Sequence, residues 1–255
     1  MSTPLSIGSF QIGENSSPFI VAEVGINHNG SLDKAIEMIE VAQKAGASAV
    51  KFQTFKATEF ISDPDQQFTY NSQGKTVTES MLAMFKRYEF SPNEWRELKK
   101  HCQKTGIVFL STPQNTGDLS LLLDIGIDAI KVGSDDFTNI PLLKTYANTK
   151  LPMIISCGMS TLSESYEALE AIGAFDGYPC ILCLCTSEYP TPPENINIRK
   201  LDSFRASFPM VHLGFSDHSL GSTAATLAVG KGAVFFEKHF TLSQDLPGPD
   251  HWFSE

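Results

Sequence analysis

The chain has 255 residues, a formal net charge of −10 at pH 7 and 42% hydrophobic residues. This length suits one (β/α)8 domain and leaves no room for a second full domain, and the acidic charge argues against nucleic acid and anionic membranes as partners. No stretch reaches the ~20 apolar residues of a membrane span, and the N-terminus lacks a basic segment followed by an apolar run, so we expect a cytoplasmic protein.

Eight short apolar segments are the candidate strands. In chain order they are residues 19–23, 49–53, 107–111, 129–133, 153–156, 181–185, 211–215 and 233–237. Unbroken apolar runs of this length are typical of buried parallel strands, because helices cover one face and the barrel interior fills the other. Ahead of them, residues 7–13 predict a small hairpin placed to close the bottom of a (β/α)8 barrel.

Helical patterns fall between these strands, as the alternation of a (β/α)8 barrel requires. The clearest covers residues 31–45, with Ser31 as N-cap and Gly46 as the stop. Its apolar stripe is Leu32, Ile36, Ile39 and Ala42. Residues 92–105 repeat the pattern between Ser91 and Gly106. Further helices are expected to begin near Thr116, Ile140, Leu162 and Ser222.

Two segments depart from the regular alternation. Residues 54–87 are longer than an ordinary connection between a strand and a helix, and insertions of this kind often form active-site lids. After the eighth candidate strand only about fifteen residues remain, so we expect the final helix of the barrel to be missing. The outer faces of the last and first strands then lack their cover, which predicts a fragment or a chain that relies on a partner.

Polar side chains gather at the carboxyl ends of the candidate strands, which is the rim that carries the chemistry of a (β/α)8 barrel. They are Glu23, Lys51, Gln53, Lys131, Ser134, Ser156, Thr186, Asp217, His218 and His239. The distribution predicts an active site at this end of the barrel.

His218 and His239 end the seventh and eighth strands, which are neighbours in a barrel, so the two imidazoles can converge on one ion. Asp217 and Glu237 stand close by in the sequence, where carboxylates complete a metal site or orient its imidazoles. Such a set suits Mn, Fe or Zn better than calcium. The alternative is that each ring simply makes a hydrogen bond at the end of its strand.

Lys51 and Lys131 lie within strands and point toward the barrel interior, where lysine is rare without an anion. The anion is either a carboxylate of the protein, Glu23 or Asp136, or a substrate. Hydroxyls and backbone amides near Ser134 and Ser156 are the ingredients of a phosphate cradle. Two lysines beside such a cradle favour a phosphorylated substrate.

Glu23 precedes a polar turn, where it can act as a general acid or base if burial raises its pKa, or form a salt bridge to Lys51. His28 and Asn29 in that turn are interpreted as turn and cap residues.

The five cysteines are Cys102, Cys157, Cys180, Cys183 and Cys185. We interpret them as small core residues in a reducing compartment; a zinc site is disfavoured because strand alternation sends Cys180 to the face opposite the other two nearby thiols.

Eight motifs in barrel order resemble the sialic acid synthase family, whose members condense phosphoenolpyruvate with an N-acetylated amino sugar to make nonulosonic acids such as N-acetylneuraminate, legionaminate and pseudaminate. The motifs are AEVGINHNG (22–30), VKFQ (50–53), IKVGS (130–134), ISCGM (155–159), CTSEYP (185–190), GFSDHS (214–219), EKHFT (237–241) and GPDH (248–251). They span nearly the whole chain.

The resemblance implies a role for each matching residue. His218 and His239 would bind a divalent metal, usually manganese, with magnesium or cobalt as substitutes. Phosphoenolpyruvate would be held by Lys51, Lys131, Ser134 and Ser156. The acceptor sugar would be held by Gln53, Tyr189 and Asp250. Glu23 and Asp136 would be the carboxylates near the reacting centre, and Ser187 would touch the bound ligand.

The sequence departs from the family pattern in three places. Asp136 stands where the sialic acid branch carries glutamate, and Ser187 stands where it carries asparagine, so the acceptor is either N-acetylmannosamine or a diacetamido sugar of the legionaminic acid type. The family's C-terminal antifreeze-like domain, which supplies an arginine across a homodimer, is absent, so residues 1–255 are expected to form the barrel domain alone. The alternatives are a related phosphoenolpyruvate-dependent 3-deoxy-keto acid synthase and an inactive barrel that serves as a binding module.

Overall fold

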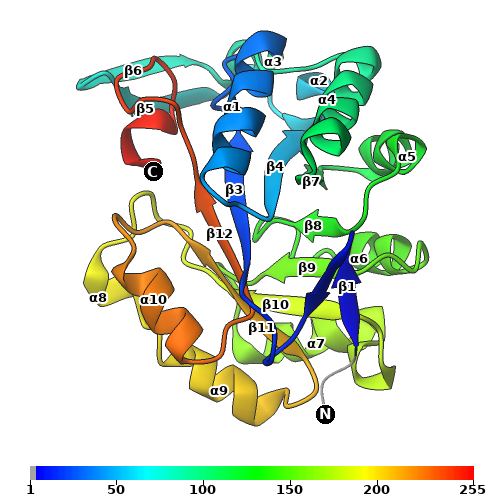
Figure 1. Cartoon of the computed structure of the whole chain (residues 1–255). Coiled ribbons are helices and arrows are strands. Elements are labelled where there is room, and N and C mark those ends of the chain that lie inside the picture. The colour runs from blue at the N-terminus through cyan, green and yellow to red at the C-terminus, as the bar shows by residue number, and fades with distance from the viewer. Residues whose placement is uncertain (1–3) are drawn as a thin grey trace. The chain divides into compact units, whose positions relative to one another are not determined.

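The computed structural model describes residues 4–255 and has an α/β fold of the (β/α)8 barrel class (Figure 1). Its eight main strands are β3 (Phe19–Gly25), β4 (Ala49–Thr54), β7 (Val108–Pro113), β8 (Ile130–Val132), β9 (Met153–Ser156), β10 (Cys180–Leu184), β11 (His212–Asp217) and β12 (Phe235–His239). They form one sheet in the order β7-β4-β3-β12-β11-β10-β9-β8. All eight predicted strands are confirmed, with ends that differ by at most two residues.

Helices follow the strands as the sequence predicts. They are α1 (Leu32–Lys44), α4 (Pro92–Thr105), α5 (Thr116–Ile125), α6 (Ile140–Ala147), α7 (Leu162–Ile172), α9 (Lys200–Ser207) and α10 (Thr223–Gly230), with the short α8 (Pro193–Ile196) and the 3-10 turn η1 (Ala174–Asp176). The sequence analysis did not single out α9. That helix begins without a side-chain cap, so the usual signal of a helix start is missing there.

The predicted caps of α1 and α4 are confirmed. The Ser31 hydroxyl accepts a hydrogen bond from the backbone N–H of Lys34. Ser91 and Glu94 form a reciprocal capping box, and Gly106 ends α4 in the left-handed region at φ 79°. The apolar stripe of α1 is rotated by about one residue from the prediction. Its buried residues are Ala35, Met38, Ile39 and Ala42, while Leu32 and Ile36 are only partly buried.

The chain divides into two compact units, described separately below. The first consists of the residues up to Val21 together with Asp128–Lys238, and the second of Ala22–Ile127 together with His239–Glu255. None of the helices in residues 4–255 has the length and apolar character that crossing a membrane requires.

In the first unit, β8 to β12 pair in parallel in chain order. The predicted N-terminal hairpin is confirmed as β1 (Leu5–Ile7) and β2 (Phe10–Ile12), an antiparallel pair. Phe10 packs edge-on against Phe19 of β3, with ring centroids 5.2 Å apart. On the same strand Ile20 is 43% exposed, in keeping with the uncovered outer face predicted for the first strand.

In the second unit, β4 pairs with β7, and Trp95 of α4 packs edge-on against Phe52 and Phe109 of these strands. The long insertion is ordered. It contains α2 (Ala57–Phe60), the antiparallel strands β5 (Gln67–Ser72) and β6 (Lys75–Ser80), and α3 (Met81–Lys86). A cluster of buried residues anchors the insertion, with partly buried aromatics packed against it. Its buried members are Ile26, Phe55, Met84 and Tyr88. A role as a lid stays a prediction.

After β12 the described chain contains the 3-10 turn η2 (His251–Phe253) and no further α-helix. This last segment, red in Figure 1, lies beside β5. The observation agrees with the expected absence of a final helix within the described residues.

The five cysteines are confirmed as core residues, since all of them are buried and none forms a disulfide. Burial raises the pKa of the Cys157 thiol to about 12, which keeps it protonated at neutral pH.

His28 is fully buried in the second unit, and its ring stacks on Phe90 with centroids 4.3 Å apart. Its Nδ1 accepts a hydrogen bond from the backbone N–H of Gly30, which confirms its interpretation as a turn residue. Burial, with a smaller contribution from His251, lowers the pKa of His28 from its ordinary value of 6.5 to about 3.

This depressed pKa predicts a pH-dependent stability. Between about pH 3 and 6.5 the unfolded chain binds the proton of His28 and the folded chain does not. The stabilisation that depends on neutral His28 is therefore fully present above about pH 6.5. Below that pH the free energy of unfolding falls by about 1.4 kcal/mol for each pH unit. Urea unfolding at pH 7.5, 6.0 and 5.0 should show His28→Gln to be less stable than wild type at pH 7.5 but less sensitive to acid. Parallel pH profiles for the two proteins would contradict this account.

Candidate active site

In the first unit, Lys131 on β8 is 2% exposed and points its ammonium at polar groups of neighbouring strands. The ammonium donates to the Ser156 hydroxyl at 2.8 Å and lies 3.7 Å from a carboxylate oxygen of Glu237. Ser216 donates to that same oxygen at 3.0 Å. Glu237 of β12 is thus a carboxylate partner of Lys131.

A small space beside Gly158 brings two of the predicted hydroxyls together. The backbone N–H of Gly158 donates to Ser134 Oγ at 2.9 Å. A Cβ on Gly158 would lie 2.7 Å from the hydroxyls of both Ser134 and Ser187, and 3.1 Å from Cys185 Sγ. A side chain at position 158 would therefore fill the space that these polar groups surround, as expected for an anion cradle.

Filling this space should weaken phosphoenolpyruvate binding. We expect Gly158→Ala to lower the affinity by at least about tenfold, because the added methyl group must displace the Ser134 or Ser187 hydroxyl. Gly230→Ala on α10 is the matched control, since a Cβ there meets no heavy atom within 4 Å. Calorimetric titration with phosphoenolpyruvate measures the effect. Equal affinity in Gly158→Ala and the control would argue against a cradle.

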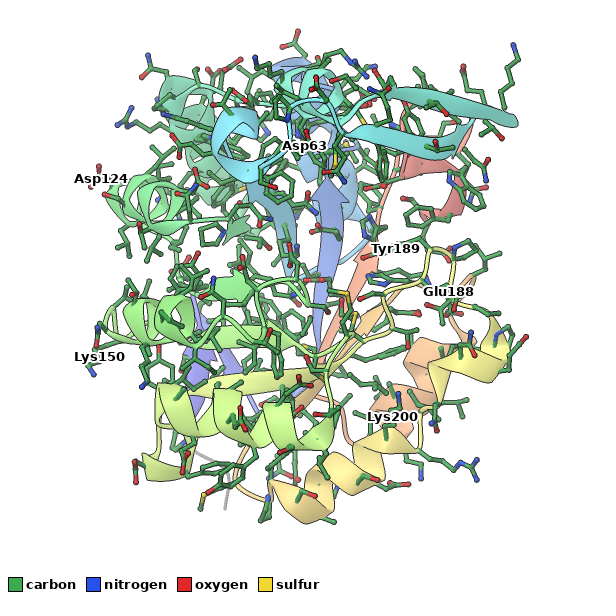
Figure 2. The ribbon with its side chains drawn as sticks, turned by 180° about the vertical axis from the view of Figure 1, so that it is seen from behind. Asp63, Asp124, Lys150, Glu188, Tyr189 and Lys200 are labelled. Atoms are coloured by element: carbon green, nitrogen blue, oxygen red, sulfur yellow. The ribbon has the colours of Figure 1, made fainter. Side chains whose placement is uncertain are left out.

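His218 follows β11 directly, and its ring is held on two sides. Its Nδ1 lies 2.7 Å from the carbonyl oxygen of Thr186, and the Tyr189 ring stacks on it with centroids 4.0 Å apart. Tyr189 lies on the loop after β10, next to Glu188 (Figure 2). Because a carbonyl only accepts, Nδ1 carries the proton and the lone pair is on Nε2. Metal-binding histidines commonly show this arrangement.

Asp217, beside His218, has both oxygens engaged within the protein. One accepts from the backbone and the hydroxyl of Ser219, at 2.8 and 2.6 Å, and the other lies 2.9 Å from the ammonium of Lys238. Lys238 also donates to the Ser219 carbonyl. The sequence allowed Asp217 to complete a metal site or to orient an imidazole; its contacts with Ser219 and Lys238 instead hold the end of the strand. The sequence analysis missed Lys238, although it immediately precedes His239.

Asp136 follows β8 and is partly buried. Burial raises its pKa, and the neighbouring charge of Asp135 acts in the same direction, while a hydrogen bond from Asn139 partly offsets both. A carboxyl with a raised pKa is better suited to exchange protons near neutral pH than an exposed one.

In the second unit, Glu23 and Lys51 form a buried ion pair. A carboxylate oxygen of Glu23 lies 2.8 Å from the Lys51 ammonium, which also donates to Thr112 at 3.3 Å. The salt bridge that the sequence analysis offered as one interpretation is therefore present. Gln53, two residues further along β4, is partly buried.

His239 and Asp250 lie close together in this unit. Asp250 Oδ2 is 3.8 Å from His239 Nδ1, and His239 Cε1 is 3.8 Å from the point that a Cβ on Gly25 would occupy. His239 is 8% exposed, whereas the Asp250 side chain is 23% exposed. The arrangement makes Asp250 the more accessible of the two.

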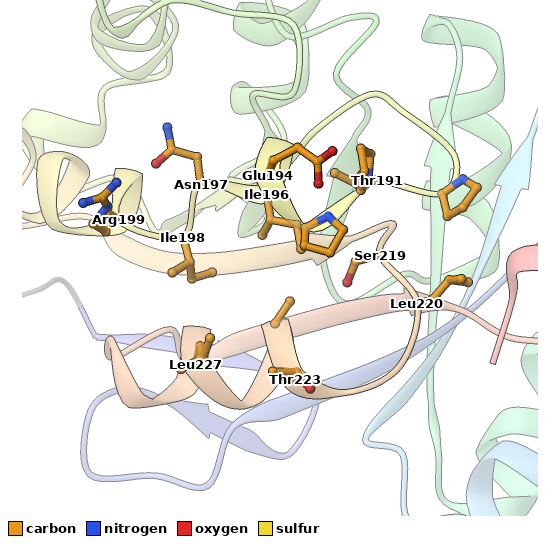
Figure 3. A pocket seen from close by; sticks show the side chains of 14 residues that line it. Thr191, Glu194, Ile196, Asn197, Ile198, Arg199, Ser219, Leu220, Thr223 and Leu227 are labelled. Atoms are coloured by element: carbon orange, nitrogen blue, oxygen red, sulfur yellow. The ribbon is translucent and has the colours of Figure 1, made fainter.

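A cavity of the first unit lies elsewhere. It has a volume of about 810 Å³ and runs between the segment around α8 and helix α10, where Ile196, Leu220 and Leu227 line it (Figure 3). None of the predicted site residues lines this cavity. The candidate site therefore lies at the polar strand ends and not in this cavity.

This chain is similar to solved structures of two enzymes. The N-acetylneuraminic acid synthetase of Leptospira borgpetersenii, solved in complex with citrate, superposes with a TM-score of 0.90 at 33% identity, covering 100% of this chain and 84% of that one. A truncated 3-deoxy-D-arabino-heptulosonate 7-phosphate synthase from Thermotoga maritima, at 16% identity and a TM-score of 0.72, shares the fold.

Residues 38–255 match the NeuB family, and the chain belongs to this family. One relative is the N,N'-diacetyllegionaminic acid synthase of Legionella pneumophila, 37% identical over 94% of this chain and 68% of its own length. The human N-acetylneuraminate-9-phosphate synthase is 32% identical over 94% of this chain and 66% of its own length. The predicted resemblance to sialic acid synthases is thereby confirmed.

Proposed function

We propose that this protein condenses phosphoenolpyruvate with an N-acetylated amino sugar to give a nonulosonic acid and inorganic phosphate. Membership in the NeuB family carries the proposal, because the named relatives are synthases of such acids. The legionaminic acid synthases of Legionella pneumophila and Campylobacter jejuni, at 37% and 38% identity, favour a diacetamido sugar as the acceptor, with N-acetylmannosamine as the alternative.

Polar and cationic residues of the first unit, together with Lys51, support the proposed binding of phosphoenolpyruvate. Lys131 and the hydroxyls of Ser134, Ser156 and Ser187 are donors suited to a phosphate and a carboxylate. Lys51, a buried cation of the second unit, is proposed for the same ligand on the family resemblance alone. These charges are local, so they can attract an anion although the whole chain is acidic.

We propose that His218 and His239 hold a divalent metal of the manganese type. His218 presents Nε2 because its Nδ1 proton is bound to a carbonyl. His239 follows Lys238, and Lys238 is paired in register with Asp217, the residue before His218. Residues 4–255 contain no cluster of three or more histidine, cysteine or acidic side chains placed to hold an ion, so the two imidazoles would need water or substrate oxygens as further ligands. Such an ion, when bound, would act as a Lewis acid on the aldehyde of the acceptor.

The proposed reaction joins C3 of phosphoenolpyruvate to the aldehyde carbon of the open-chain sugar. The positive charge that develops at C2 is stabilised by Glu23 and Asp136. Water then adds at C2, and the carbon–oxygen bond to phosphate breaks, so that phosphate leaves beside Lys51 and Lys131. Gln53, Tyr189 and Asp250 hold the acceptor.

The buried, reduced cysteines suit the cytoplasm. We propose a homodimer for a form of the chain that carries the family's C-terminal domain.

The test is to incubate the protein with phosphoenolpyruvate and a panel of N-acetylated amino sugars, with manganese, magnesium or cobalt. Phosphate release should occur only with an amino sugar present, and mass spectrometry should find the nine-carbon acid. Phosphate release with simple aldose phosphates would instead indicate a 3-deoxy-keto acid synthase. Binding of phosphoenolpyruvate without turnover of any acceptor would indicate an inactive barrel.

A further inference from the structure

The segment that carries Asp250 is held in place by side chains from two distant parts of the second unit. One part is the turn at residues 27–30, and the other is the β5–β6 hairpin of the long insertion. In Figure 1 the hairpin lies beside the red C-terminal segment. The loop around Asp250 is therefore shaped by side chains 172 to 222 residues away in sequence.

Asn29 bridges the two ends of this loop with one side-chain amide. Its Nδ2 donates to the carbonyl of Pro247 at 2.8 Å, and its Oδ1 lies 3.2 Å from His251 Nε2. Its backbone has φ 53°, a left-handed conformation that asparagine tolerates better than most residues. The two contacts enclose Gly248, Pro249 and Asp250.

The protonation state of His251 agrees with its contact to Asn29. Because Oδ1 of an amide only accepts, Nε2 of His251 carries the proton, and Nδ1 lies 2.6 Å from the Thr241 hydroxyl. Burial, with a contribution from Lys34, lowers the pKa of His251 to about 4, so the ring is neutral near pH 7. One tautomer therefore satisfies both neighbours.

Gly248 and the hairpin fix the loop from the other side. Gly248 has φ 146°, and a Cβ on it would lie 2.8 Å from His251 Cδ2 and 3.1 Å from Asn29 Oδ1. Its backbone N–H donates to Ser72 Oγ at 3.0 Å, and Gln73 donates to the Asp245 carbonyl at 2.8 Å. The loop has little room for another conformation while these contacts persist.

We propose that Asn29 is a positioning residue for the acceptor sugar, acting through the 247–251 loop that presents Asp250. The inference rests on the proposed function, because Asp250 is the residue proposed to hold the acceptor. Asn29 reaches the loop with a donor and an acceptor at fixed places, and no aliphatic or acidic side chain supplies both. The amide of Asn29 thus holds one side of the loop, while Ser72 and Gln73 hold the other.

The test replaces Asn29 with aspartate, which keeps the shape and removes the donor. A carboxylate oxygen then faces the Pro247 carbonyl, so the loop should shift. We expect KM for the acceptor to rise about tenfold, the scale of one lost hydrogen bond, with KM for phosphoenolpyruvate and the affinity for manganese unchanged. Hydrogen exchange of the amides of Gly248, Asp250 and His251 should accelerate.

Asn197→Asp is the matched control, since Asn197 is an exposed asparagine that is also left-handed, at φ 45°, and lies in the first unit. It should leave both KM values at the wild-type level. If Asn29→Asp does not fold, Gln73→Ala removes another anchor of the segment and should raise acceptor KM selectively, though less.

The outcomes separate this inference from the proposed function. An active wild type whose Asn29→Asp variant keeps the acceptor KM overturns the positioning role, as does an equal rise in both KM values. A wild type that condenses phosphoenolpyruvate with no amino sugar overturns the proposed function. In that case, unchanged hydrogen exchange in the 247–251 loop of Asn29→Asp also shows that Asn29 does not anchor the loop.

Discussion

Replacing His218 with glutamine should reduce condensation by about a thousandfold and remove most of the bound metal. A Lewis acid at a carbonyl is worth several kcal/mol of transition-state stabilisation, and each 1.36 kcal/mol corresponds to about tenfold in rate. Glutamine can still donate a hydrogen bond to the Thr186 carbonyl but is a weak ligand for manganese. His239→Gln should give the same loss. The measurements are metal content by mass spectrometry and the rate of phosphate release under saturating manganese.

His101→Gln is the control for these variants. His101 lies on α4 in contact with Glu40 at 3.2 Å, away from every predicted site residue in sequence. We expect wild-type metal content and rate in this variant. Unchanged metal content in both His218→Gln and His239→Gln would show that the ion, if one is bound, is held elsewhere.

Replacing Lys131 with methionine should have two separable effects. Phosphoenolpyruvate affinity should fall by on the order of 2 kcal/mol, the scale of a lost charged hydrogen bond. Stability should also fall, by about 3 kcal/mol, because the Glu237 carboxylate is 5% exposed and stays buried without the Lys131 ammonium beside it. Calorimetric titration measures the first effect and urea unfolding the second.

The double variant Lys131→Met with Glu237→Gln separates the effects. It should recover most of the lost stability, because the buried charge is gone, but none of the lost affinity. Lys231→Met is the surface control, since Lys231 pairs with Asp202 in an exposed position and such pairs are worth at most about 1 kcal/mol. Wild-type affinity in Lys131→Met would exclude this lysine from the substrate site.

The acceptor is the part of the function that is hardest to predict from the sequence. Asp136 and Ser187 differ from the sialic acid branch in the sequence pattern, and both are shorter than the residues they replace. Ser187 lies at the Gly158 cradle, where its hydroxyl is 2.7 Å from the Cβ position.

The sequence by itself determined the strands, most of the helices and the list of rim residues. These features depend on local patterns: apolar runs of strand length, and caps such as Ser91 with Glu94 at the start of α4. The motif order was also sufficient to indicate the family, which the NeuB match over residues 38–255 confirms. Strand alternation correctly placed Lys51 and Lys131 in the interior, since both are at most 3% exposed.

Only the tertiary structure decided which groups meet. Alternation says which face a side chain takes but not its partner across the sheet, so Lys131 pairs with Glu237, and Asp217 with Lys238. His28 and Asn29 read alike as turn residues, yet one is buried among aromatic rings and the other bridges a loop more than 200 residues away. Such contacts arise from packing between distant segments, and no local pattern of sequence encodes them.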